Sequence, residues 1–145
     1  MITAAINRLE YLLDLLPAKL QAIADADFSH KPAGDKWSKK EIMGHLIDSA
    51  ANNHHRFIRA RYEENPELVY DQDQWNTFSH YHTMDKDQLL QFWELYNRHL
   101  LHLIRNIPGN ELAKSCNTGH TVTLDWLIRD YVQHLEHHLA QILKY

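Results

Sequence analysis

The sequence predicts an all-α protein: a four-helix bundle that forms one domain over residues 1–145. Four segments repeat apolar residues every three or four positions, which places those residues along one face of a helix. No segment alternates apolar and polar residues as a half-buried strand does. The 145-residue length and the 44% share of hydrophobic residues are typical of a chain with one compact core.

The first helix is expected over residues 3–25, where the apolar stripe is regular. Pro17 lies inside this segment and has no backbone N–H, so we expect a kink or an early end near Leu16. Residues 27–36 contain both proline and glycine and are expected to form a loop.

The second helix is expected to begin after Ser38. Ser38 and Glu41 have the spacing in which each side chain binds a backbone N–H at the other end of the first turn. Its apolar stripe fades before Pro66. Residues 65–84 then show no helical period and form an unusually long connection, which makes that connection a candidate for part of a site.

The third and fourth helices have similar start signals. Asp85 and Gln88 repeat the capping spacing, and the third helix ends at Pro108. Its predicted buried stripe consists of Leu89, Phe92, Tyr96, Leu100, Leu103 and Ile107. After a polar loop, Thr123 is expected to cap a fourth helix that runs to Ile142.

Charge and composition exclude several classes of protein. A net charge of −4 disfavours a nucleic-acid partner. No apolar run approaches the roughly 20 residues that span a bilayer, and charges such as Arg8 interrupt the first helix, so we expect a cytoplasmic protein.

The single cysteine, Cys116, cannot form an internal disulfide. We expect it to be packed and inert, and the alternative is a nucleophile with His120 as its base.

Twelve histidines point to a site. His134 and His138 are four positions apart, so both rings lie on one face of the fourth helix, about 6 Å apart along its axis. That face borders the core, whereas His137 points towards solvent. His45 borders the apolar stripe of the second helix and is the best third metal ligand. Core-edge histidines hydrogen-bonded to neighbouring helices are the alternative.

The other pairs are expected to be solvated or to support the site: His54 with His55, His80 with His82, and His99 with His102.

Three further residues are candidate substrate contacts. Ser49 and Arg56 follow on the same edge of the second helix, where the arginine either binds an anionic group or forms a surface salt bridge. Trp75 lies in the long connection, where a tryptophan more often anchors a loop. We identify no carboxylate suited to proton transfer, because Asp48 and Glu136 are expected to point away from the apolar faces of their helices.

Two segments resemble the signatures of the DinB-like superfamily, which includes the YfiT-like proteins. They are Lys-Trp-Ser-Lys-Lys-Glu-Ile-Met-Gly-His-Leu-Ile-Asp at residues 36–48 and His-Leu-Glu-His-His-Leu-Ala-Gln-Ile at residues 134–142. The Asp-Gln-Asp-Gln-Trp stretch at residues 71–75 is also similar, and the resemblance covers nearly the whole chain. It implies an up-down-down-up bundle, often dimeric, with a divalent ion such as nickel or zinc on three histidines. By position these are His45, His134 and His138.

The resemblance also implies a class of chemistry. Characterised relatives include transferases and isomerases that use a low-molecular-weight thiol, and others are named metal-dependent hydrolases. We therefore expect a metal-dependent enzyme that activates a small thiol, in an S-transferase type of reaction, or water, for attack on a small electrophilic substrate. The alternative of a different class is a non-catalytic bundle, either a metal- or ligand-binding stress protein or a dimeric interaction module.

Overall fold

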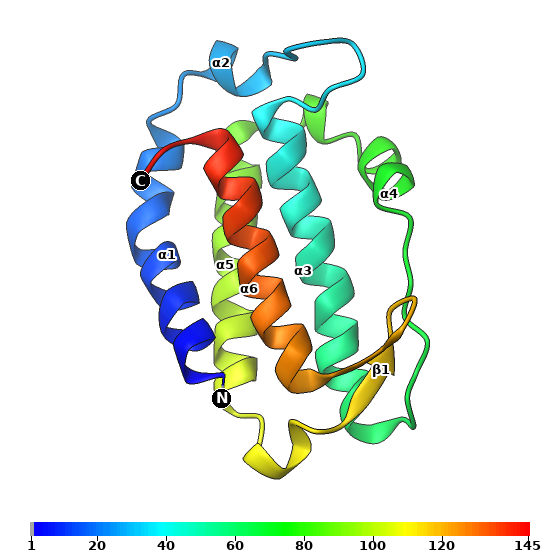
Figure 1. Cartoon of the computed structure of the whole chain (residues 1–145). Coiled ribbons are helices and arrows are strands. Elements are labelled where there is room, and N and C mark those ends of the chain that lie inside the picture. Colours follow the sequence, from blue (N-terminus) through cyan, green and yellow to red (C-terminus); the bar gives the residue numbers. More distant parts are fainter. Residues whose placement is uncertain (1) are drawn as a thin grey trace.

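The computed structural model describes residues 2–145. Within that range the bundle consists of four long helices: α1 (Thr3–Gln21), α3 (Lys39–Tyr62), α5 (Lys86–Arg105) and α6 (Leu124–Ile142). In Figure 1, α1 and α6 run upwards while α3 and α5 run downwards, so the predicted up-down-down-up topology is confirmed. Helices α1 and α3 each pack against both α5 and α6.

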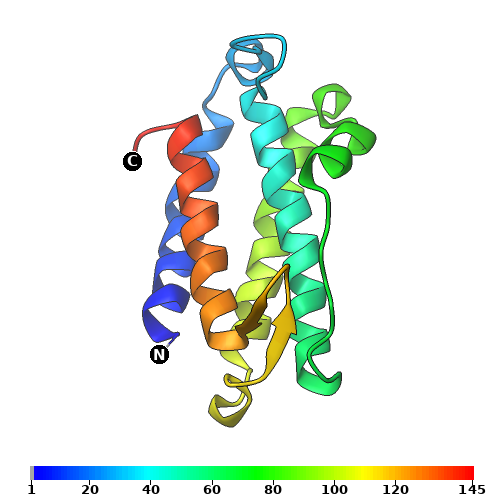
Figure 2. The same ribbon diagram turned by 45° about the vertical axis from the view of Figure 1, so that its right-hand side comes forward.

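Shorter elements connect the long helices (Figures 1 and 2). Helix α2 interrupts the loop expected after the first helix, and α4 and a 3₁₀ turn lie within the long connection. Figure 2 shows α4 standing out beside the upper end of α3. The bounds of these elements are α2 Asp25–Ser29, α4 Gln72–Ser79, η1 Tyr81–Thr83, η2 Gly109–Glu111, β1 Ser115–Asn117 and β2 Thr121–Thr123.

The expectation that the chain has no strands is wrong for residues 115–123, where β1 and β2 form an antiparallel hairpin. Strands of three residues are too short to show an alternating pattern in the sequence. Gly119 takes a φ of +110° in the turn, a value that L-residues rarely adopt. Asn117 also pairs with the chain that follows α3: its N–H donates to the carbonyl of Pro66 and its carbonyl accepts from the N–H of Leu68, both at 2.8 Å. The hairpin therefore fastens the long connection to the base of the bundle.

The predicted caps are confirmed. Glu41 N–H donates to Ser38 Oγ and Ser38 N–H donates to Glu41 Oε1, both at 3.1 Å, so the reciprocal box is complete. The side chains of Asp85 and Thr123 each accept a backbone N–H from the third residue of α5 and α6. Short-range polar signals thus fix where three of the long helices begin.

Pro17 does not end the first helix, so the expected early end near Leu16 is wrong. Helix α1 continues to Gln21 and stops short of the predicted residue 25. The missing N–H of Pro17 deprives the carbonyl of Leu13 of its usual intrahelical donor. Arg98 of α5 replaces it, since its Nη2 donates to that carbonyl at 3.0 Å. A contact between helices thereby compensates for the proline.

The buried face of α5 differs from the predicted one. Phe92 is 47% exposed, whereas Trp93 is fully buried. Asn97 lies at the centre of the buried face, where its Nδ2 donates to the carbonyl of Trp93 at 2.9 Å and its Oδ1 accepts from Tyr131 Oη at 2.5 Å. Asn97 is a polar residue in the core, so it interrupts the apolar pattern in the sequence. The predicted buried stripe of α5 is therefore displaced by about one residue from the observed one.

Candidate metal centre

Three histidines from two neighbouring helices converge near one end of the bundle. His45 belongs to α3, and His134 and His138 are one turn apart on α6. The ring centroids are 5.1 Å apart for His45 and His134, 4.7 Å for His45 and His138, and 4.6 Å for His134 and His138. One nitrogen from each ring lies within 4.8 Å of the other two. We call these three residues the histidine trio.

The spacing of the trio suits a shared ion. Nε2 of His45 and Nε2 of His134 are 3.2 Å apart. Two imidazole nitrogens on a tetrahedral ion with bonds of about 2.05 Å lie roughly 3.3 Å apart. In the absence of an ion, one of these rings can donate an N–H to the other. The donor set also fits a divalent transition metal, because imidazole is the commonest protein ligand for such ions.

Burial keeps the trio neutral. His45 is fully buried and the other two histidines are half-buried. Burial, followed by the neighbouring rings, lowers the pKa of His45 to about 3 and that of His134 to about 4. The pKa of His138 is also lowered, again chiefly by burial. Metal ligation requires an unprotonated imidazole, so all three nitrogens are available near neutral pH.

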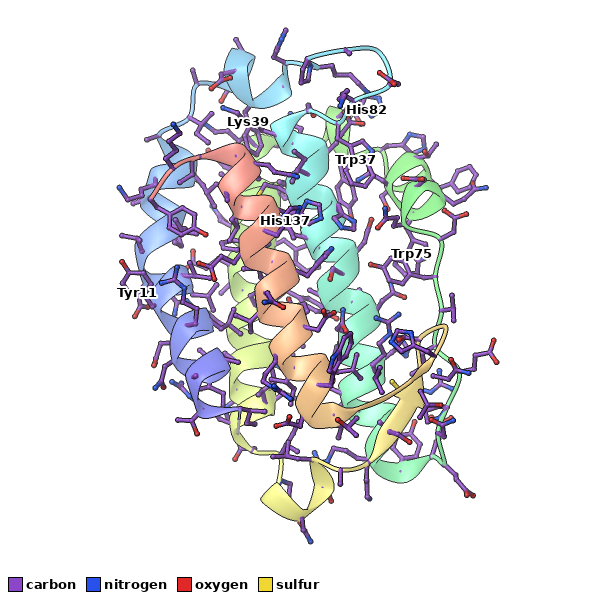
Figure 3. The ribbon with its side chains drawn as sticks, viewed as in Figure 1. Tyr11, Trp37, Lys39, Trp75, His82 and His137 are labelled. Atoms are coloured by element: carbon purple, nitrogen blue, oxygen red, sulfur yellow. The ribbon has the colours of Figure 1, made fainter. Side chains whose placement is uncertain are left out.

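Two contacts orient the trio. Nδ1–H of His138 donates to Oε1 of Gln141 at 2.9 Å, which leaves Nε2 of this ring for a ligand. Trp37 lies at the upper end of α3 in Figure 3, with its ring centroid 5.0 Å from that of His45. His137 is exposed on α6 and stays outside the trio, as predicted.

A pocket of about 570 Å³ opens beside the trio and reaches His138. Its walls come from the loop before α3, the start of α4 and the end of α6. The lining residues are Pro32, Asp35, Lys36, Trp37, Ile42, Gln72, Asp73, His138 and Gln141. The mixture of an aromatic ring, amides and both signs of charge can receive a small polar molecule.

A buried carboxylate lies one turn beyond His45, contrary to the expectation that Asp48 points away from the core. Asp48 is 2% exposed, its Oδ1 accepts from Tyr81 Oη at 2.5 Å, and its Oδ2 has no partner among residues 2–145. Burial raises the pKa of Asp48 to about 6. The 3₁₀ turn η1 brings Tyr81 onto α3 at Gly44, where only a glycine leaves room for the ring. The structure thus supplies an ionisable group on the helix that carries His45.

The sequence contains one signal for this burial. From residue 43 to residue 50 every residue of α3 is buried, and Asp48 is the only one of them that is Asp, Glu, Lys or Arg. These eight residues span about two turns, and a helix with little charge on any face packs on all sides, including the side that carries Asp48.

The candidate substrate contacts lie in different places. Ser49 is buried, and its hydroxyl is 3.3 Å from Nδ2 of Asn53. Arg56 forms no salt bridge among the described residues. Its Nε and Nη2 instead donate to the carbonyl of Leu68 at 3.0 and 2.8 Å and hold the long connection against α3. Trp75 is 41% exposed on α4, at the side of the bundle seen on the right of Figure 3, and does not line the pocket beside the trio.

The remaining candidates lie away from the trio. His80 and His82 are exposed, with ring centroids 6.2 Å apart. Cys116 is fully buried in β1, and burial raises the pKa of its thiol, which agrees with a packed and inert residue. His120 is exposed and contacts the ring of Trp126 instead.

The sequence profile of the DinB superfamily matches residues 2–142. The chain belongs to the DinB superfamily. Its relatives within that superfamily include "Putative metal-dependent hydrolase YfiT" of Bacillus subtilis, which is 25% identical over 139 residues, or 90% of this chain and 78% of YfiT. "Putative metal-dependent hydrolase BH0277" of Halalkalibacterium halodurans is 24% identical over 134 residues, or 88% of this chain and 78% of that relative.

Solved structures of similar proteins share the fold of this DinB superfamily member. Bacillus subtilis YfiT, described as having an unusual four-helix bundle topology, superposes with a TM-score of 0.83 at 23% identity, over 98% of this chain and 86% of YfiT. A variant of a mycothiol-dependent maleylpyruvate isomerase superposes with a TM-score of 0.82 at 11% identity, over all of this chain and 62% of the isomerase. In residues 2–145, no helix has the length and apolar character required to traverse a bilayer.

Proposed function

We propose that His45, His134 and His138 hold one divalent metal ion and that the protein is a metal-dependent enzyme acting on a small molecule. The observation that carries this proposal is the convergence of three neutral imidazoles at the edge of an open pocket. The names of the curated relatives support it at the level of a metal-dependent reaction. Nickel or zinc is the ion we propose, because imidazole suits both.

The chain's own residues prepare the site. Gln141 fixes the ring of His138 by accepting its Nδ1–H, and Trp37 packs beside His45 at the pocket wall. The burial of His45 keeps water from one side of the trio. When bound, an ion on three neutral imidazoles supplies Lewis acidity that makes a small thiol nucleophilic without a general base, or water acidic near neutral pH.

Transfer of a low-molecular-weight thiol to a small electrophile is the reaction we propose first. The pocket has the size of a small-molecule site, and its lysine and two aspartates offer partners to the charged groups of a polar thiol. The mycothiol-dependent isomerase with the same fold is consistent with a thiol as one reactant.

Hydrolysis is a second candidate because of one particular observation. Asp48 is buried on α3, its Oδ2 is unpartnered within residues 2–145, and its pKa is raised to about 6. A carboxylate with such a pKa can accept a proton near neutral pH. The relatives named as hydrolases agree with this second candidate.

Several finer assignments stay predictions. They concern substrate contacts by Ser49, Arg56 and Trp75, and a homodimeric assembly. In the structure Arg56 has a clear structural contact to Leu68, so its guanidinium must change partners to bind a substrate anion.

A spectroscopic titration distinguishes the two reactions. We expect the cobalt-loaded protein to show a sulfur-to-cobalt charge-transfer absorption when a small biological thiol is added, because three histidines leave room for one further ligand. The His134→Ala variant is the matched control and should show no such band. An unchanged spectrum at saturating concentrations of several thiols would overturn thiol activation in favour of hydrolysis.

A further inference from the structure

A second pair of histidines meets on the opposite side of α3. His54 follows His45 by nine positions, which is about half a turn away in direction at 100° per residue. Its ring faces that of His99 on α5, with centroids 5.3 Å apart and an interplanar angle of 78°. This separation is close to the 4.6–5.1 Å between the rings of the histidine trio. The two imidazoles, one from each helix, are therefore close enough for both rings to approach one ion.

A hydroxyl group orients one of these rings. Oη of Tyr96 lies 2.8 Å from Nδ1 of His54. In metal sites the ligating histidine commonly donates its other ring N–H to an oxygen, which fixes the tautomer and directs the free nitrogen at the ion. Tyr96 is one turn before His99 on α5, so this helix supplies one imidazole and also the group that orients the other.

The surroundings of the pair allow access and favour a neutral His54 ring. His99 is exposed and His54 is half-buried, beside a surface pocket of about 410 Å³ lined by His54, His55, Ile58, Arg59 and Tyr62. Burial lowers the pKa of His54, and the charges of His99 and His55 lower it further to a lesser degree. By contrast, the ring centroids of His80 and His82 are 6.2 Å apart, and both residues come from one short segment of the chain.

We propose that His54 and His99 form a second binding site for a divalent transition metal such as zinc, nickel or copper, with water completing the coordination. Two imidazoles bind more weakly than three, so this site fills after the trio. An ion held there bridges α3 and α5, which already pack side by side, and stabilises the folded bundle by mass action. The site does not depend on the proposed enzymatic function.

Calorimetric titration of the whole untagged protein with zinc tests the proposal. We expect a tight step and then a weaker step of about one further ion per chain. The double variant His54→Ala/His99→Ala should lose only the weaker step. Tyr96→Phe keeps both imidazoles and should weaken that step by about tenfold, since loss of an orienting group typically has an effect of this size.

The matched control replaces the neighbouring histidines on the same two helices. His55→Ala/His102→Ala removes the same number of imidazoles and should leave both steps unchanged. Equal loss of the weaker step in both double variants would overturn the proposal and indicate unspecific binding to surface histidines. A wild-type titration without a weaker step would overturn it as well. If the trio bound no zinc, the His54/His99 step would still appear alone, so the two proposals fail separately.

Discussion

Gly44 is expected to be indispensable for the contact between the turn η1 and α3. A methyl group at this position would lie 2.7 Å from Cε2 of Tyr81 and closer still to two other ring atoms, whereas ordinary van der Waals contact begins at 3.4 Å. In Gly44→Ala the ring of Tyr81 must therefore move by more than the difference between 2.7 Å and 3.4 Å. Such a shift disturbs the hydrogen bond from Tyr81 Oη to Asp48 and leaves a buried carboxyl group without its partner.

The expected cost combines three contributions. Overpacking costs about 1–3 kcal/mol, and losing a hydrogen bond to a buried polar group costs about 1–3 kcal/mol. The better helix propensity of alanine offsets about 1 kcal/mol of this. We therefore expect Gly44→Ala to lower the free energy of unfolding by about 3 kcal/mol, measured by urea denaturation of the metal-free protein at pH 7.

Two comparisons make this prediction specific. Gly34 lies in an exposed loop, where an added methyl group would meet no atom within 4 Å, so Gly34→Ala should change stability by less than about 0.5 kcal/mol. In a Tyr81→Ala background the clash is absent, and Gly44→Ala should be neutral or slightly stabilising. An equal loss of stability in both backgrounds, or no loss in the wild-type background, would refute the reasoning.

Two further predictions concern the trio. Replacing His45, His134 or His138 by alanine should each lower zinc affinity by at least about tenfold, as measured by competition with a chelating dye, whereas His137→Ala should change it little because that ring is exposed and outside the cluster. The opposite ranking of His137→Ala and His138→Ala would contradict the assignment. The metal-free protein should also lose stability as the pH falls from about 6.5 towards 4. Histidines of the unfolded chain bind protons near pH 6.5, but folded His45 and His134 do so only at about 3 and about 4. The contribution of these two histidines to the free energy of unfolding is thus fully present above pH 6.5 and declines below it. Urea denaturation at pH 8, 7, 6 and 5 measures this, and a profile as steep in the His45→Ala/His134→Ala variant as in the wild type would exclude these two groups as its source.

The sequence predicts the long helices and the histidine trio because both depend on short-range periodicity. The Ser38–Glu41 capping box is encoded within one turn, and so is the spacing of His134 and His138. The pairing of α3 with α6 then brings His45 to that pair. The prediction that His45 joins this pair rests on its place at the border of an apolar stripe and on the pair itself.

The remaining features depend on contacts between distant segments. Tyr81 and Asp48 are 33 positions apart in the sequence, and no local pattern predicts the hydrogen bond between them. The meeting of His54 with His99 likewise depends on how α3 and α5 are rotated about their axes. Asn97 hides that rotation in the sequence, because a buried, hydrogen-bonded amide looks like a surface residue.

The metal content of the protein tests the central claim most directly. Untagged protein, purified without chelators and dialysed against metal-free buffer to remove weakly held ions, should contain about one divalent ion per chain by elemental analysis. The variant without His45, His134 and His138 should contain none. A wild-type protein that holds no ion, and that gains no thermal stability when zinc or nickel is added, would contradict the account and favour a non-catalytic bundle.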